Sequence, residues 1–88
     1  SEAPATLRLR LLAPELRAAV GGLRDVEAPV AQLAELRLRP RGVLVVENLA
    51  SARAFDDVPG VAVVAGLGAG VSLLSQLDWA RDARWGYW

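Results

Sequence analysis

The spacing of apolar and polar residues near the start of the chain predicts a strand followed by a helix. In "TLRLRLL", residues 6–12, leucines alternate with arginines. This period of two is typical of a strand with one buried face and one face in water. Pro14 ends the strand and can begin a short helix, which we expect to run through Val20. The pair Gly21 and Gly22 then ends that helix.

The next segment, "DVEAPVAQLAELRL", is predicted to form a second short helix. Asp25 and Glu27 lie near its expected start, and Pro29 suits the first helical position. An apolar stripe follows at helical spacing, formed by Val30, Leu33 and Leu36. Residues 37–42, "RLRPRG", read as a connector that proline interrupts.

From Gly42 onward, three apolar runs predict three more strands. "VLVVE", residues 43–47, is a continuous run of mainly β-branched residues, which is typical of a strand covered on both faces. "VAVVAGLG", residues 61–68, predicts a second buried strand, and "ARWGYW", residues 83–88, predicts a third. Residues 56–60, "DDVPG", have the composition of a turn.

Helical patterns separate these strands. Residues 48–55, "NLASARAF", predict a short helix that Asn48 can cap. Residues 69–80, "AGVSLLSQLDWA", predict another, with Val71, Leu74 and Leu77 on one face. The order βαβαβ predicts an α/β fold: a Rossmann-like parallel sheet with right-handed crossovers, a leading N-terminal strand and short helices. We expect residues 1–41 to form a lead-in and residues 42–88 the first part of the α/β domain.

Length and composition limit the possible functions. The chain has 88 residues, enough for one small domain, and 53% of them are hydrophobic. Cysteine and histidine are absent, which excludes disulfides, thiolate or imidazole metal ligands and cysteine or histidine catalysis within this chain. The formal net charge is zero, so no overall basic field attracts nucleic acid.

No apolar run can span a bilayer and no signal peptide is visible, and we expect a cytoplasmic protein. The absence of methionine suggests a piece of a longer chain.

Glu47 stands at the end of the first strand of the βαβαβ unit. Ligands of open parallel sheets bind beyond the carboxyl ends of the strands, so a carboxylate here can hold Mg²⁺ or act as a general acid or base. The alternative is a solvated residue favoured by the dipole of the following helix. The pattern alone leaves both open. A single acid is not a magnesium site, since phosphoryl-transfer centres normally supply several oxygen ligands.

The glycine-rich "GLGAG", residues 66–70, is a second candidate. Gly66 and Gly68 lie between a predicted strand and a predicted helix, where backbone amides can approach a phosphate. The dinucleotide fingerprint needs a further glycine where Val71 stands, and no lysine follows to make a P-loop. The pattern favours a tight turn over a nucleotide site.

Three weaker candidates favour structural interpretations. Arg37, Arg39 and Arg41 could contact DNA phosphates, but arginines in such a segment more often lie in a connector exposed to solvent. Adjacent side chains diverge, so Asp56 and Asp57 favour turn formation over a metal pair. Packing in a core or an interface is favoured over base stacking for the aromatic residues Trp79, Trp85, Tyr87 and Trp88.

The segments "VLVVENLASARAF", "VPGVAVVAGLGAGVSLL" and "ARWGYW" together resemble the C-terminal Toprim-like domain of the JetD family, the nuclease subunits of Wadjet anti-plasmid defence systems. That domain is similar to the Toprim domain of the topoisomerase VI A subunit. The resemblance covers Gly42 to Trp88, and extends more weakly to "LRLRLL" and "APVAQLAEL" before it.

The resemblance implies that Glu47 is the first-strand glutamate of a Toprim domain. Such domains hold Mg²⁺ between this glutamate and an Asp-x-Asp pair on a later strand, for cutting or rejoining DNA. In the family the acidic pair directly follows the strand that resembles "RWGYW". The resemblance therefore implies that Trp88 is followed by the acidic pair in the parent protein. Asn48, Gly66 and Gly68 would support the site. The chain alone is then expected neither to bind Mg²⁺ tightly nor to cleave DNA, whereas its parent would act on DNA delivered by a condensin-like complex.

Two alternatives remain beside a Toprim nuclease fragment. One is a non-enzymatic α/β module that binds a nucleotide or phosphate at Gly66 to Gly70. The other is a structural or oligomerisation piece, because an apolar last strand leaves an open edge and spare aromatic surface. We therefore expect the chain to self-associate through that edge.

Overall fold

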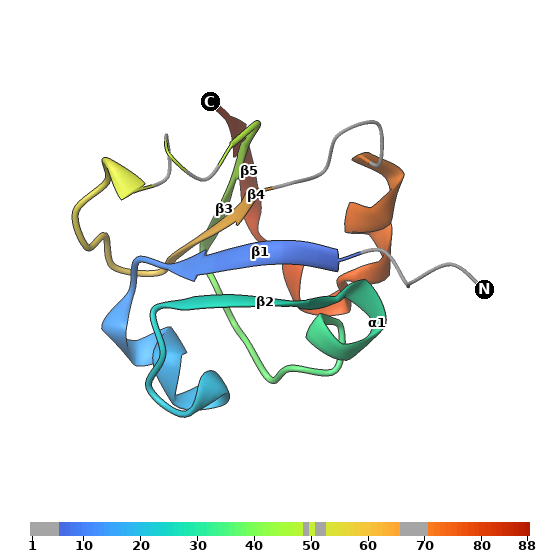
Figure 1. The fold of residues 1–88 in the computed structure, drawn as a ribbon, viewed down its shortest axis with the longest axis horizontal. Coiled ribbons are helices and arrows are strands. Elements are labelled where there is room, and N and C mark those ends of the chain that lie inside the picture. The colour runs from blue at the N-terminus through green and yellow to red at the C-terminus, as the bar shows by residue number, and fades with distance from the viewer. Residues whose placement is uncertain (1–5, 49, 51–52, 66–70) are drawn as a thin grey trace.

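A five-stranded mixed sheet forms the centre of the protein (Figure 1). The computed structural model describes residues 6–48, 50, 53–65 and 71–88. The strands are β1 (Thr6–Leu11), β2 (Asp25–Pro29), β3 (Gly42–Val46), β4 (Val61–Ala65) and β5 (Arg84–Tyr87). Their order across the sheet is β2-β1-β4-β3-β5. Strands from both sides of residue 42 therefore belong to one sheet.

The helical elements are short. They are the 3-10 helix η1 (Pro14–Val20), the α-helix α1 (Val30–Leu33), and the 3-10 helices η2 (Val71–Gln76) and η3 (Asp78–Ala80). The prediction for η1 is confirmed: it begins at Pro14 and ends at Gly21, whose φ of 67° is readily adopted by glycine. The helix expected over residues 69–80 is divided into η2 and η3 at Leu77, whose backbone is not helical. The helix expected over residues 48–55 falls partly outside the described residues.

The sequence placed Asp25 and Glu27 near a helix start and predicted no strand here. Both residues belong to strand β2, and α1 begins after them at Val30. β2 pairs antiparallel with β1, and Arg10 and Arg8 face Asp25 and Glu27, respectively, across the pair. These two cross-strand ion pairs measure 2.7 Å and 3.3 Å. Polar and apolar residues alternate through "DVEAP", as a half-buried strand requires, and the charges of β1 supply its partners. Pro29 lies just before α1 rather than at its first helical position.

The expected parallel arrangement holds for three strands only. β3 pairs in parallel with β4 on one side and with β5 on the other. The leading strand β1 runs antiparallel to β4, and β2 runs antiparallel to β1. The fold is therefore a mixed α/β sheet and not a wholly parallel one. β1 can enter this position because its leucine face matches the buried face of β4, with Leu9 beside Val64.

Buried residues lie on both faces of the sheet. The larger core contains alternate residues of β1, β3 and β4 together with residues of the helices, among them Leu7, Leu9, Leu11, Leu33, Val43, Val45, Val64 and Leu77. The smaller core on the opposite face contains Leu12, Val46, Val63 and Ala65, with Leu44, Phe55 and Val61 packed against it. Alternation along each strand produces this division, so β3 is buried from both sides, as its sequence predicts.

Candidate functional site

The carboxyl ends of β3, β4 and β5 lie at one edge of the sheet, because these strands are parallel. Figure 1 shows β3 and β5 running toward the same edge, close to the C-terminal end of the chain. Glu47 directly follows β3 at this edge, and its side chain is exposed. It makes no hydrogen bond or ion pair with any residue that the structure describes. Its carboxylate is therefore available to a ligand.

The end of β5 lies next to the end of β3. Leu44 is paired with Gly86 and Val45 with Tyr87, and the backbone N–H of Trp88 donates a 2.8 Å hydrogen bond to the carbonyl of Val45. Trp88 thus lies at the same edge of the sheet as Glu47, which follows β3.

An aromatic contact joins the segment after Glu47 to the end of β5. The rings of Phe55 and Trp88 meet edge to face, with centroids 5.3 Å apart and planes at 78°. Such a contact contributes on the order of 0.5–1.5 kcal/mol beyond the area it buries. It lies on the smaller-core face of the sheet, where Phe55 packs against β3 and β4. The contact therefore links the chain on either side of the candidate site.

Of the other residues expected at the site, Asn48 is among those that the structure describes. Asn48 follows Glu47 and is exposed. Gly66 and Gly68 lie outside the described residues, so their expected role at a phosphate or in support of Glu47 stays a prediction.

The residues that the structure describes do not make a complete magnesium site. Across the described ranges, no group of three or more acidic, histidine or cysteine side chains is arranged to hold a metal ion. Glu47 supplies one oxygen-bearing ligand of the kind that Mg²⁺ prefers, but one carboxylate does not fill an octahedral ion. We therefore derive no catalytic step from this chain alone.

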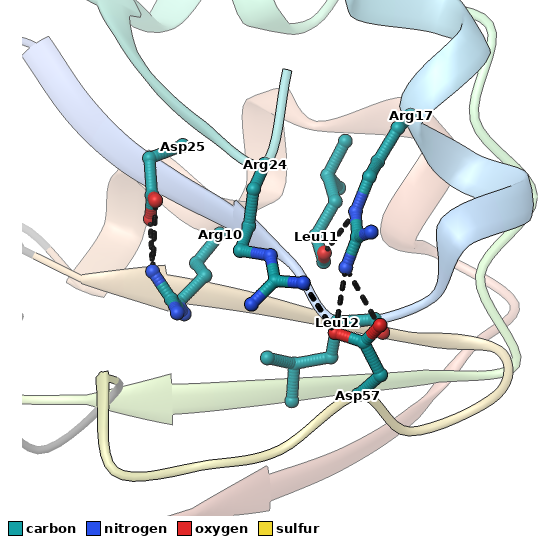
Figure 2. A network of polar contacts seen from close by, with 7 residues as sticks. All are labelled: Arg10, Leu11, Leu12, Arg17, Arg24, Asp25 and Asp57. Carbon is teal, nitrogen blue, oxygen red and sulfur yellow. Dashed lines mark hydrogen bonds and ion pairs between the residues drawn. The ribbon is translucent and has the colours of Figure 1, made fainter. Parts of the chain in front are cut away.

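Asp57, expected only to shape a turn, is an ion-pair centre (Figure 2). Its Oδ1 accepts hydrogen bonds from Arg17 at 2.7 Å and lies 3.0 Å from a guanidinium nitrogen of Arg24. Arg17 also donates to the carbonyl of Leu11 at 3.0 Å, and so joins η1, the end of β1 and the loop before β4. The single negative charge of Asp57 faces two guanidinium groups, which favours a structural role. No local pattern could reveal it, since Arg17 and Asp57 are 40 positions apart.

A second polar contact fixes the same loop. The backbone N–H of Gly60 donates a 3.0 Å hydrogen bond to Glu15 in η1. Gly60 has a φ of 76°, which bends the chain into β4. Two charged side chains of η1, Glu15 and Arg17, therefore hold the loop that leads into β4.

Arg10 is the described charged residue that is most fully buried, with 8% of its surface exposed. Its Nη1 donates to both carboxylate oxygens of Asp25, at 2.7 Å and 2.8 Å (Figure 2). Its Nε is buried without a hydrogen-bond partner among the described residues. The pair crosses from β1 to β2 and holds the outer strand to the sheet.

The structural interpretation of the tryptophans is confirmed for Trp79, whereas Trp85 is 37% exposed. Trp79 packs against the larger core and donates from Nε1 to the carbonyl of Leu33 at 2.8 Å. Trp85 donates from Nε1 to the carbonyl of Ala80 at 3.1 Å. The arginines of the connector, Arg37, Arg39 and Arg41, are exposed as expected.

None of the helices in the described part of the chain is both long and apolar enough to cross a membrane.

These features define a small mixed α/β domain that presents an acidic residue at the carboxyl edge of its parallel strands. A family model described as the C-terminal region of the Wadjet protein JetD matches residues 1–88, which is the whole chain. The chain therefore belongs to the JetD C-terminal family and is related to a component of Wadjet defence. The match includes the lead-in before Gly42, where the resemblance was weaker. No curated protein matches the chain.

Proposed function

We propose that this chain is the first part of a Toprim-like domain in a magnesium-dependent, DNA-cleaving subunit of a Wadjet anti-plasmid system. Membership of the JetD C-terminal family supports the defence assignment. The position of Glu47 carries the proposal: an exposed carboxylate directly after β3, at the edge where β5 ends beside it.

In this proposal Glu47 is one ligand of Mg²⁺. Carboxylate oxygens are the ligands that this hard cation prefers, and a catalytic ion of this kind normally draws its ligands from more than one side chain. Open α/β sheets bind their ligands beyond the carboxyl ends of parallel strands, where Glu47 lies. Asn48, Gly66 and Gly68 are proposed to support that edge.

The remaining ligands are proposed to follow Trp88 in the parent protein. The parallel register of β3 and β5 supports this, because it sets Trp88 at the same edge of the sheet as Glu47. An Asp-x-Asp sequence on that continuation would bring three carboxylates to one edge. We propose that the parent protein cleaves DNA in the cytoplasm, and that a condensin-like complex delivers this DNA. Neither tight Mg²⁺ binding nor DNA cleavage is proposed for these 88 residues alone.

The decisive experiment replaces Glu47 by glutamine in the full-length parent protein, assembled with its defence partners. We expect loss of Mg²⁺-dependent plasmid cleavage with an unchanged melting temperature, since the exposed side chain makes no hydrogen bond or ion pair with a described residue.

A matched control is Glu35→Gln, because Glu35 is also exposed but lies away from the strand edge, after α1. This variant should cleave at the wild-type rate. Wild-type cleavage by Glu47→Gln would refute the proposed role of Glu47.

A further inference from the structure

The connector between α1 and β3 carries a regular row of arginines. Residues 37–41 read Arg-Leu-Arg-Pro-Arg, and in Figure 1 they belong to the green trace that leads from α1 to β3. Exposed and buried residues alternate along this segment: the three arginines are exposed, whereas Leu38 and Pro40 are buried. Residues 37–40 form no helix or turn, and a proline favours an extended backbone in the residue before it. The two buried residues therefore anchor the segment and leave Arg37, Arg39 and Arg41 in solvent.

The three arginines of this row are not neutralised by described neighbours. Other arginines of the described chain form ion pairs with carboxylates, namely Arg8, Arg10, Arg17, Arg24 and Arg81. Arg37, Arg39 and Arg41 form no ion pair and no side-chain hydrogen bond with any residue that the structure describes. Because the formal net charge of the whole chain is zero, the row is a local concentration of positive charge on a neutral protein.

A cavity of about 760 Å³ adjoins the row. Arg37 and Arg39 line it together with residues of η1, namely Glu15, Leu16, Ala18 and Ala19. The carboxylate of Glu15 already accepts a 3.0 Å hydrogen bond from the N–H of Gly60. Two guanidinium groups and one carboxylate thus border the cavity, and this balance favours an anionic ligand.

We propose that Arg37, Arg39 and Arg41 bind phosphate groups of the DNA backbone. Alternate residues of an extended segment lie about 6–7 Å apart, which is comparable with the separation of neighbouring phosphates along one DNA strand. A guanidinium group also matches two phosphate oxygens at once. The inference rests on the proposed function, because that function makes DNA the polyanion that the protein meets.

The surroundings of the row favour nucleic acid over an acidic protein surface. Protein interfaces have an apolar core that is rich in aromatic residues. The exposed large apolar side chains of the described chain belong neither to the row nor to the lining of its cavity; they are Leu23, Val58, Trp85, Tyr87 and Trp88. A contact with phosphates needs no apolar core, because charge-assisted hydrogen bonds and counterion release supply most of its free energy.

The row is separate from the edge of the sheet that carries Glu47. Arg41 directly precedes β3 and Glu47 directly follows it, so the length of this strand, roughly 16 Å, lies between them. The arginines therefore contact phosphates other than the one at the proposed magnesium site. They hold the DNA and take no part in the chemical step, and their contacts carry no sequence information.

The test measures DNA binding by the full-length parent protein without Mg²⁺, over a range of salt concentrations. We expect Arg37→Gln combined with Arg39→Gln to weaken binding roughly tenfold at physiological salt. The slope of log K against log salt should fall by about 2, since each lost phosphate contact removes about 0.9. Arg41→Gln alone should lower the slope by about 1. Lysine at positions 37 and 39 keeps both charges and should retain most of the slope.

A matched control combines Arg8→Gln with Arg81→Gln. It removes the same total charge, but from two exposed arginines that have carboxylate partners. This control should keep the wild-type salt slope. The variant at Arg37 and Arg39 should keep the wild-type melting temperature, weaken binding to two duplexes of unrelated sequence equally, and raise KM for cleavage while leaving kcat unchanged.

An unchanged salt slope in the Arg37 and Arg39 variant, or an equal loss in the control, would overturn the proposal. Normal DNA binding together with weakened binding to the defence partners would also overturn it, since the row would then be a protein contact. Glu47→Gln should bind DNA as the wild type does when Mg²⁺ is absent. The roles proposed for the row and for Glu47 can therefore fail separately.

Discussion

Arg10 and Asp25 form a bidentate ion pair across β1 and β2, with both contacts below 3 Å. Arg10 is almost fully buried while the carboxylate of Asp25 is 46% exposed. The pair therefore neutralises a guanidinium that is largely withdrawn from water, and it fixes a strand that the sequence patterns did not predict.

Asp25→Ala should lower the free energy of unfolding by about 2 kcal/mol, because it leaves the charge of Arg10 buried and unpaired. Urea denaturation measures the change. Asp82→Ala removes an exposed carboxylate with no described contact and should change stability by less than about 0.5 kcal/mol. Equal effects of the two substitutions would show that the Arg10–Asp25 pair adds nothing.

The adjacent residues Asp56 and Asp57 should respond differently to replacement by alanine. Asp57 pairs with Arg17 and Arg24, whereas Asp56 is exposed and has no described partner. We expect a loss of about 1 kcal/mol for Asp57→Ala and almost none for Asp56→Ala, since partly exposed ion pairs are weak. The difference should shrink in 1 M salt, which screens the pair. A difference that is independent of salt would point to a role for Asp57 other than ion pairing.

Phe55 and Trp88 should be energetically coupled. A double-mutant cycle with Phe55→Ala and Trp88→Ala, followed by denaturant unfolding, is expected to give a coupling of about 0.5–1.5 kcal/mol. Trp88→Phe keeps an aromatic ring and should retain part of it. Additive effects of the two alanine substitutions would mean that the 5.3 Å contact does not hold the end of β5 to the segment after Glu47.

Gly60→Ala should destabilise the protein more than Gly21→Ala does. Both glycines have positive φ, 76° and 67°, so both substitutions carry a backbone strain of about 1–2 kcal/mol. At Gly60 an added Cβ would also lie 2.8 Å from Nε of Arg41, whereas at Gly21 it would meet nothing within 4 Å. Thermal unfolding of the two variants measures the difference. Equal losses would show that the side chain of Arg41 moves aside freely.

Elements with a strong local pattern were predictable from the residues themselves. The alternation of leucine and arginine in β1 and the apolar runs of β3, β4 and β5 each predict a strand that the structure contains. Pro14 and Gly21 bracket η1 for reasons of backbone geometry that operate within a few residues. The position of Glu47 at the end of β3 was also predictable, because Glu47 comes directly after the apolar run that forms this strand.

What the tertiary structure alone decided is which segments meet. β2 is a strand because β1 offers Arg8 and Arg10 to its two acids, a partnership spanning 15 to 19 positions that a helix-start pattern conceals. The insertion of β1 between β2 and β4, the neighbouring ends of β3 and β5, and the ion pairs of Asp57 likewise depend on segments distant in the chain. Periodicity and capping act over a few residues, whereas pairing is selected by complementary surfaces of the folded chain, and no local pattern encodes that choice.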